Sequence, residues 1–245
     1  MKQTDLYHHY DKIGNHQSND FRISSIINLI LPYLEYGKLI LDAGCGSCAQ
    51  LVPLLRMGHL IEGIEPSEEI LSIGKRYLIK EGCPITVVKK ISISDHSKEK
   101  KEHYEQIVCL DVIEHIEDDL EAMNAMYKML KKRGRLLLTV PAIPYLYGEK
   151  DRKVGHYRRY AKRELVSKIR SAGFIIKDIR YWNFLGLAPT CISVKLLKTE
   201  VSESFRQNKG PGSRLINFIL SAWFNAIENN VRPPLGLTLF VYAEK

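Results

Sequence analysis

The chain has 245 residues, enough for one globular domain with a sizeable core. Hydrophobic residues make up 45% of it and charged residues 26%, as in an ordinary globular protein, and no stretch is long and apolar enough to span a membrane. The formal net charge of +8 favours an anionic partner, such as nucleic acid, a phosphorylated substrate or an anionic lipid surface, although simple solubility explains it equally well.

The cysteines and the N-terminus indicate a cellular setting. There are five cysteines, an odd count, and the hydrophilic N-terminus has no signal-peptide pattern, so we expect a reducing, cytoplasmic location. Cys45 and Cys48 form a Cys-x-x-Cys pair, but a second pair is missing, so a zinc site of that type is not expected.

The first part of the chain, 1–56, contains a glycine turn between a predicted strand and a predicted helix. Residues 1–20 are polar, and the spacing of apolar residues predicts a helix over 21–34. The apolar run 39–41 predicts a buried parallel strand that ends at Asp42, and a helix is expected over 49–56. Gly44 and Gly46 lie between them and permit positive φ and close approach of a ligand to the backbone. Strand, glycine turn and helix N-terminus together predict a nucleotide-type site.

Glu65 supports this interpretation, because it closes a second apolar strand, 60–64, about twenty residues further on, where an acidic residue binds a ribose diol. Ser67 can cap the helix that follows. The later elements are expected as helices 67–81, 118–132 and 162–172 and strands 85–88, 106–110, 136–140, 174–182 and 237–243. Their alternation predicts a doubly wound α/β sheet, whose ligands bind at the carboxyl ends of the strands.

Four segments in this order resemble the motifs of class I S-adenosylmethionine (SAM)-dependent methyltransferases of the type 11/12 kind: 42–46, 63–67, 111–116 and 134–141. The resemblance covers roughly residues 21–180. It implies a Rossmann-like sheet of seven strands with helices on both faces, a last strand that is antiparallel, and a single domain over 1–245. The SAM contacts that it implies are Asp42, Gly44, Cys45, Gly46, Glu65, Pro66, Ser92, Asp111 and Val112. Cys48 departs from the third glycine of the first motif.

The segment Asp111-x-x-Glu114-His115 is similar to one in the ubiquinone-pathway O-methyltransferases and in small-RNA 2′-O-methyltransferases, which hold a divalent metal. That resemblance implies a metal set of Asp111, Glu114, His115 and His156, with Mg²⁺ as one candidate ion. Asp111 is one methylene shorter than the usual Glu, which puts the fourth ligand in doubt. Without a metal, Glu114 pairs locally and His115 packs against SAM.

The segment 148–160 resembles a bacterial methyltransferase subgroup with a Gly-His-x-Arg-Arg-Tyr sequence. His156 or His115 is the expected acceptor of the substrate proton, together with Glu114, and Asp151 is expected to orient His156. The two arginines that follow, Arg158 and Arg159, either bind an anionic group of the substrate or pair with carboxylates at the sheet edge.

A helical insertion, 183–235, is expected before the last strand, and its segment 215–227 is strongly apolar. Three roles are open: a cap over the acceptor site, a homodimer interface in a chain that is otherwise monomeric, or a peripheral contact with a membrane that presents a lipid-linked acceptor. The segment is too short to span a bilayer.

The expected function is therefore SAM-dependent O-methylation of a small molecule, a sugar or a lipid-linked glycan. An RNA 2′-O-methyltransferase is the first alternative, which the basic charge favours and the apolar insertion opposes. A non-catalytic SAM-binding subunit of a complex is the second. An NAD-dependent oxidoreductase shares the glycine turn and the distal acid, but the Glu114–His115 pair has no evident role there.

Overall fold

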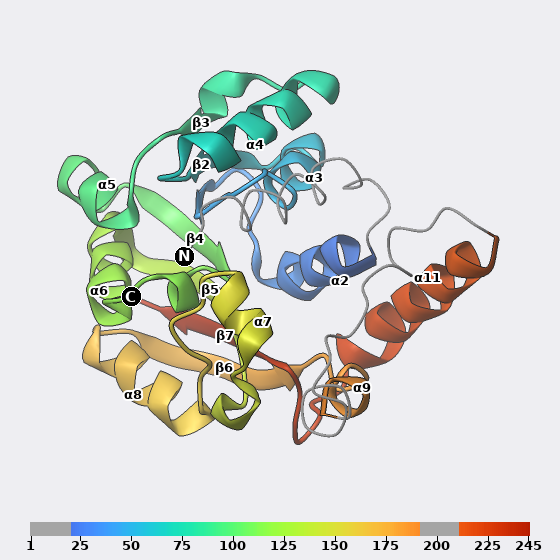
Figure 1. Cartoon of the computed structure of the whole chain (residues 1–245). Helices are drawn as coiled ribbons and strands as arrows, with labels where there is room; N and C mark the ends of the chain where they lie inside the picture. The colour runs from blue at the N-terminus through green and yellow to red at the C-terminus, as the bar shows by residue number, and fades with distance from the viewer. Residues whose placement is uncertain (1–20, 192–210) are drawn as a thin grey trace.

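The computed structural model describes residues 21–191 and 211–245. Seven strands form one mixed sheet in the order β3–β2–β1–β4–β5–β7–β6, which confirms the predicted α/β fold (Figure 1). The strands are β1 (Leu39–Ala43), β2 (Leu60–Ile64), β3 (Val88–Lys89), β4 (Tyr104–Leu110), β5 (Leu130–Pro141), β6 (Ile175–Trp182) and β7 (Thr238–Glu244). Strands β1 to β5 are parallel, and β7 runs antiparallel to both β5 and β6.

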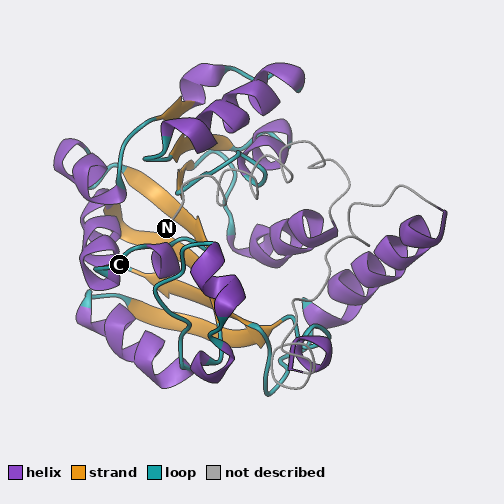
Figure 2. Cartoon of the chain, in the orientation of Figure 1, coloured by secondary structure: helices purple, strands orange, loops and turns teal. Residues whose placement is uncertain are grey.

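Helices cover both faces of the sheet (Figure 2). They are α2 (Phe21–Ile30), α3 (Leu51–Arg56), α4 (Glu68–Lys80), α5 (Ile93–Glu99), α6 (Asp119–Met129), α7 (Glu149–Lys153), α8 (Lys162–Ser171), α9 (Leu187–Cys191) and α11 (Pro211–Trp223). Buried side chains of α2, α3 and α4 form one core with the sheet, and those of α5, α6 and α8 form the other. Ser67 caps α4 as predicted, since its hydroxyl accepts from the Ile70 amide.

The helix expected over 118–132 is too long by one turn. Helix α6 ends at Met129, and the basic residues 131–133 already belong to β5. The reason is a bulge in the pairing of β4 with β5, between Tyr104 and Gln106. Gly134 serves this bulge and not a helix end, because a Cβ there would lie 2.8 Å from the Lys131 carbonyl oxygen.

One further expectation needs correction, and three short elements were not predicted. The strand expected over 85–88 is a 3₁₀ turn (Ile85–Val87) followed by the two-residue edge strand β3. The polar segment 92–101 contains α5, and the loop 142–160 contains a 3₁₀ turn (Pro144–Leu146) and α7. Each of these elements is short, so its hydrophobic period is too brief to be recognised in the sequence.

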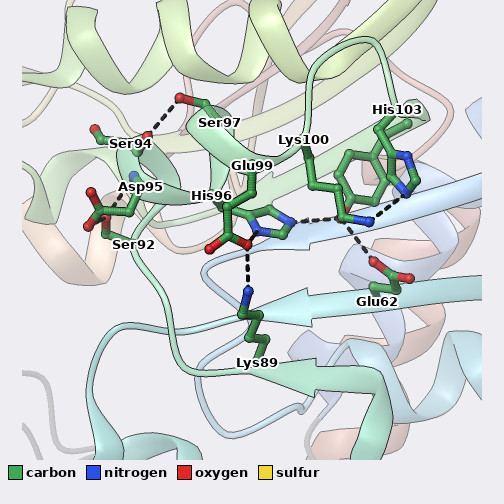
Figure 3. A network of polar contacts seen from close by, with 11 residues as sticks. Glu62, Lys89, Ser92, Ser94, Asp95, His96, Ser97, Glu99, Lys100 and His103 are labelled. Carbon is green, nitrogen blue, oxygen red and sulfur yellow. Dashed lines mark hydrogen bonds and ion pairs between the residues drawn. The ribbon is translucent and has the colours of Figure 1, made fainter.

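Helix α5 is tied to the sheet by a chain of buried polar groups (Figure 3). The His96 Nε2 atom lies 2.7 Å from the Tyr104 hydroxyl, which donates to a Glu62 carboxylate oxygen at 2.9 Å. Burial, followed by the contacts with Glu62, raises the pKa of Tyr104 far above its usual value, so the phenol remains a donor. These contacts join the middle of α5 to the first residue of β4 and to β2.

The topology places both ends of the insertion at that same edge. Strand β6 is parallel to β1, because β6 and β5 are both antiparallel to β7, so β6 ends and β7 begins at the carboxyl edge of the parallel strands. No helix among the described residues is long and apolar enough to cross a membrane. Residues 1–20 and the middle of the insertion, 192–210, lie outside the described residues.

Candidate active site

The glycine turn after β1 is shaped by the backbone. Gly44 has φ +89° and Gly46 has φ +51°, the conformation for which glycine is favoured. The amides of Gly44 and Cys45 both donate to the Ile64 carbonyl oxygen at 2.9 Å, which holds the turn against β2. A Cβ at Gly44 would lie 2.6 Å from the Val112 side chain, so the turn and the segment after β4 are in close contact.

Two cysteine side chains fill the space behind this turn. Cys48, at the position of the usual third glycine, has φ +62° and is fully buried. A Cβ at Gly74 of α4 would lie 2.6 Å from the Cys48 sulfur, and one at Gly63 of β2 would lie 2.9 Å from the Cys45 sulfur. Both thiols are therefore packing groups, and the hydrogen bond with Cys48, followed by burial, raises the pKa of Cys45.

Two buried carboxyl groups face the turn. Asp42 at the end of β1 is 4% exposed, and its Oδ2 atom has no hydrogen-bond partner in the structure. Burial, followed by the charge of Glu65, raises the pKa of Asp42 to about 7. Glu65 accepts from the Ser67 amide at 2.9 Å, and burial raises its pKa although the amides of Ser67 and Gly46 oppose the shift. An unpaired carboxyl group of this kind fits a cationic ligand.

The remaining predicted SAM contacts have mixed surroundings. Val112 packs against the glycine turn, and Pro66 is exposed beside Glu65. Ser92 caps α5, because its hydroxyl accepts from the Asp95 amide at 3.1 Å. Asp111 has φ +55°, and its Oδ1 atom accepts from the Thr139 hydroxyl at 3.0 Å.

An aspartate and a histidine are paired in the loop after β5. The His156 Nδ1 atom lies 3.0 Å from Asp151 Oδ1, and Asp151 is 2% exposed. Burial alone would raise the pKa of Asp151, but hydrogen bonds from His156 and Arg159 outweigh it and lower the pKa. An ionised Asp151 only accepts hydrogen bonds, so this contact places a proton on His156 Nδ1 and turns Nε2 away from Asp151.

Glu114 and His115 lie against this pair. The His156 Nε2 atom is 4.0 Å from Glu114 Oε1, and the rings of His115 and His156 meet edge to face at 4.6 Å. Glu114 is completely buried, neither of its carboxyl oxygens has a partner, and burial, followed by Asp111, raises its pKa well above the usual range. One ligand atom from each of Glu114, His115 and His156 lies within 4.8 Å of the others, whereas Asp111 is not part of that group.

The two arginines of the Gly-His-x-Arg-Arg-Tyr segment are engaged inside the protein. Arg158 donates to the Glu117 carbonyl at 2.7 Å and pairs with Asp119 at 3.0 Å, and Arg159 pairs with Asp151 at 2.9 Å. Of the two expected roles, the structure therefore supports pairing with carboxylates. The contacts of Arg158 hold the loop 142–160 to the start of α6, and the contact of Arg159 helps to fix Asp151.

Thr139 and Ile143 were not recognised in the sequence. Thr139 is fully buried in β5, and its hydroxyl orients Asp111, whose amide also donates to the Thr139 carbonyl oxygen at 3.1 Å. A polar residue within the apolar run of a central strand was the available signal. Ile143 has φ +61°, which is unusual for a β-branched residue, and no feature of the sequence indicates it.

Comparison with known sequences agrees with this geometry. A family model described as a methyltransferase domain matches residues 15–183, more than half of the chain. A ubiquinone biosynthesis O-methyltransferase from Shewanella sp. (strain ANA-3) is 29% identical over 124 residues, which is 48% of this chain and 52% of that relative. The chain thus spans about half the length of this relative.

Solved structures share the fold. A SAM-dependent methyltransferase from Thermotoga maritima, titled a possible histamine N-methyltransferase, has a TM-score of 0.60 at 20% identity and covers 98% of this chain and 99% of its own. A SAM-dependent methyltransferase from Archaeoglobus fulgidus has a TM-score of 0.56 at 14% identity, with coverage of 88% and 89%. At these identities the likeness concerns the fold alone.

Proposed function

The chain belongs to the class I SAM-dependent methyltransferases, and we propose that this enzyme methylates an oxygen nucleophile of a small molecule, a sugar or a lipid-linked glycan, with His156 as the base. The observation that carries the proposal is the Asp151–His156 pair at the carboxyl edge of the sheet. The name of the ubiquinone-pathway relatives agrees with an oxygen as the methylated atom.

The residues at the glycine turn fit SAM. Its sulfonium and ammonium groups are cationic, and the unpaired Asp42 Oδ2 atom is a buried acceptor that suits a cation. In this proposal Glu65 binds the ribose diol, and the positive φ of Gly44 and Gly46 lets the ligand approach the backbone. When bound, SAM supplies an electrophilic methyl group together with its leaving group.

The chain itself has to place the acceptor and remove its proton. His156 Nε2 accepts the hydroxyl proton of the acceptor, and the oxygen becomes nucleophilic as that proton leaves. Asp151 keeps the Nδ1 proton in place and stabilises the imidazolium that forms.

Replacement of His156 tests this role. We expect His156→Ala to lower kcat by about 10²–10⁴-fold, with unchanged affinity for the product S-adenosylhomocysteine. His59→Ala is a matched control, because His59 is also buried but lies at the start of β2, at the opposite edge of the sheet. Full turnover by His156→Ala would contradict the proposal.

As an alternative to the role of His156 as the base, we propose that Glu114, His115 and His156 can hold a divalent cation, which would take the His156 Nε2 lone pair. Two imidazoles and one carboxylate suit Zn²⁺ or Mn²⁺ better than Mg²⁺, and the unpaired Glu114 oxygens are suitable ligands. Asp151 would orient His156 for the ion, which would act as a Lewis acid. In thermal denaturation, Mn²⁺ should raise the Tm of the wild type and leave that of Glu114→Gln unchanged.

The proposed role of the insertion, 183–235, within the single domain 1–245 is to cover the acceptor site. It is held firmly at its base, which supports this role. Glu228 is buried and accepts from the amides of Phe184 and Leu185 at 3.1 and 2.9 Å. The Asn229 carboxamide oxygen accepts from the Trp182 indole at 2.8 Å, and its amide group donates to the Ser25 carbonyl of α2. These bonds join the two ends of the insertion to β6 and α2.

A further inference from the structure

Helix α11 turns a continuous apolar stripe to the solvent. Leu215, Phe218 and Ile219 are 60%, 71% and 55% exposed, and Ala222 and Ala226 continue the stripe at helical spacing. Figure 1 shows α11 at the margin of the molecule, with α2 on its inner side. Such a stripe normally faces a protein core, so its orientation toward solvent requires an explanation.

The opposite side of α11, which carries both polar and apolar residues, faces the protein. Asn217 and Ser221 line a cavity of about 520 Å³ between α11, α2 and α3, and the Asn225 carboxamide accepts from Asn28 of α2 at 3.0 Å. Leu220 and Trp223 pack against the core. The helix is thus fixed by its inner contacts, and the apolar stripe is free of packing within the described part of the chain.

The exposed apolar side chains are concentrated in this region. Half of the large hydrophobic residues that are exposed in the described chain belong to the insertion, and they are Phe184, Leu185, Leu215, Phe218, Ile219, Ile227, Val231 and Leu235. Two more, Tyr145 and Tyr157, lie in the loop 142–160. Both segments leave the carboxyl edge of the sheet, at which the proposed acceptor site lies.

The charges of the same segments are predominantly basic. By sequence, the insertion contains six lysines and arginines against three glutamates; four of the six basic residues lie outside the described residues, and Glu228 is buried and hydrogen bonded. Helix α7 exposes Lys150, Arg152 and Lys153 together with one acidic residue, Glu149, which pairs with Lys153 at 3.2 Å, whereas its Asp151 is buried. Apolar side chains flanked by lysine and arginine are the combination that binds an anionic lipid surface.

We propose that the outer stripe of α11 docks on an anionic lipid bilayer, with the carboxyl edge of the sheet toward the membrane. The stripe carries no charged residue between Leu215 and Ile227, which suits the boundary between headgroups and acyl chains. The docking proposal depends only on the exposed side chains and charges described above. Its consequence, that the acceptor is carried by a lipid, rests on the proposed methyltransferase function.

Co-sedimentation of the full chain with vesicles tests the docking. We expect binding to vesicles of phosphatidylcholine with phosphatidylglycerol, weaker binding to phosphatidylcholine alone, and a loss of about tenfold or more in partitioning for Phe218→Ser/Ile219→Ser. The matched control is Ile79→Ser, because Ile79 is 64% exposed on α4 and outside the stripe; it should bind like the wild type.

Two further measurements keep the outcomes separate. Calorimetric binding of S-adenosylhomocysteine by the double variant reports that it is folded and that the methyltransferase site is intact, without any lipid. The proposal is overturned if the wild type binds neither kind of vesicle, or if the double variant binds vesicles as strongly as the wild type does. Light scattering that shows a dimer in the wild type and a monomer in the double variant would assign the stripe to a second copy of the chain instead.

Discussion

The glycine turn after β1 and the loop 142–160 after β5 leave the same edge of the sheet, yet they are held in different ways. The turn is fixed by backbone geometry, with positive φ at Gly44 and two amides on the Ile64 carbonyl. The loop is fixed by charged side chains, chiefly the contacts of Asp151 and Asp119. Substitutions should therefore disturb the turn through space and φ, and the loop through lost charge pairs.

Helix α6 contributes Asp119 to the charged contacts that hold the loop 142–160. Asp119, at its first turn, accepts from the Tyr160 hydroxyl at 2.7 Å and from Lys168 at 2.6 Å, and it also pairs with Arg158. The Tyr160 side chain is fully buried. This cluster holds the end of the loop 142–160 while Asp151 holds its middle, so the two aspartates can be tested separately.

The largest effect is expected for the turn. Gly44→Ala combines an unfavourable positive φ with a Cβ at 2.6 Å from Val112, so we expect it to lower the free energy of unfolding by about 2–5 kcal/mol and to abolish SAM binding. Gly58 has nearly the same φ, +88°, but no atom lies within 4 Å of a Cβ built there. Gly58→Ala should therefore lower the free energy of unfolding by only about 1–2 kcal/mol. If chemical denaturation shows that both variants lose the same free energy of unfolding, the contact of the new Cβ with Val112 has no effect on stability.

The next effect concerns the loop. Asp151→Asn can no longer hold the Nδ1 proton of His156 as a charged acceptor, and we expect kcat to fall by about 10²–10⁴-fold while S-adenosylhomocysteine binds as before. Asp119→Asn is the control, since it weakens the same loop away from His156; it should lower stability and keep kcat within about threefold. Similar kcat losses in both variants would assign a structural role to Asp151.

A smaller effect follows from the raised pKa of Asp42. The group is protonated in the folded protein below about pH 7, and a cationic ligand prefers the carboxylate, so SAM affinity should rise about tenfold between pH 6 and pH 8. Because the folded pKa lies above the unfolded one, the stability of the ligand-free protein should fall over the same rise in pH. In calorimetry, Asp42→Asn should bind SAM more weakly and without this pH dependence; an unchanged profile would refute the assignment.

The smallest effect is expected at Cys48. Cys48→Gly removes the cost of φ +62° for a side chain but also removes the sulfur that packs against Gly74. These changes oppose each other, so the free energy of unfolding should change by less than about 1 kcal/mol. A large loss in chemical denaturation would mean that thiol packing, and not the backbone, determines the shape of the turn.

The two regions also differ in how far the sequence predicts them. The turn was predictable, because Gly44, Gly46 and Glu65 act through local backbone geometry and a fixed spacing. The Asp151–His156 contact lies within five residues and was also predicted, from the resemblance to a known subgroup. The pairing of Arg158 with Asp119 was not predicted, because it depends on the packing of α6 against the loop 142–160.

Errors in the predicted fold also arise from contacts between segments that are distant in the sequence. The strand β5 begins at Leu130 because that residue pairs with Tyr104 across a bulge, a contact between distant segments that overrides the local basic pattern of a helix end. Thr139 acquires its role only when β5 lies beside the turn at Asp111. Local signals thus predicted element types well and their ends poorly.

The most direct test of the central claim is a calorimetric titration of the purified chain with S-adenosylhomocysteine, with NAD as a control ligand. The account predicts micromolar binding of S-adenosylhomocysteine, no binding of NAD, and an affinity at least about tenfold lower in Glu65→Ala, which loses the acceptor for the ribose. Binding of NAD alone, or affinity that Glu65→Ala leaves unchanged, would contradict it.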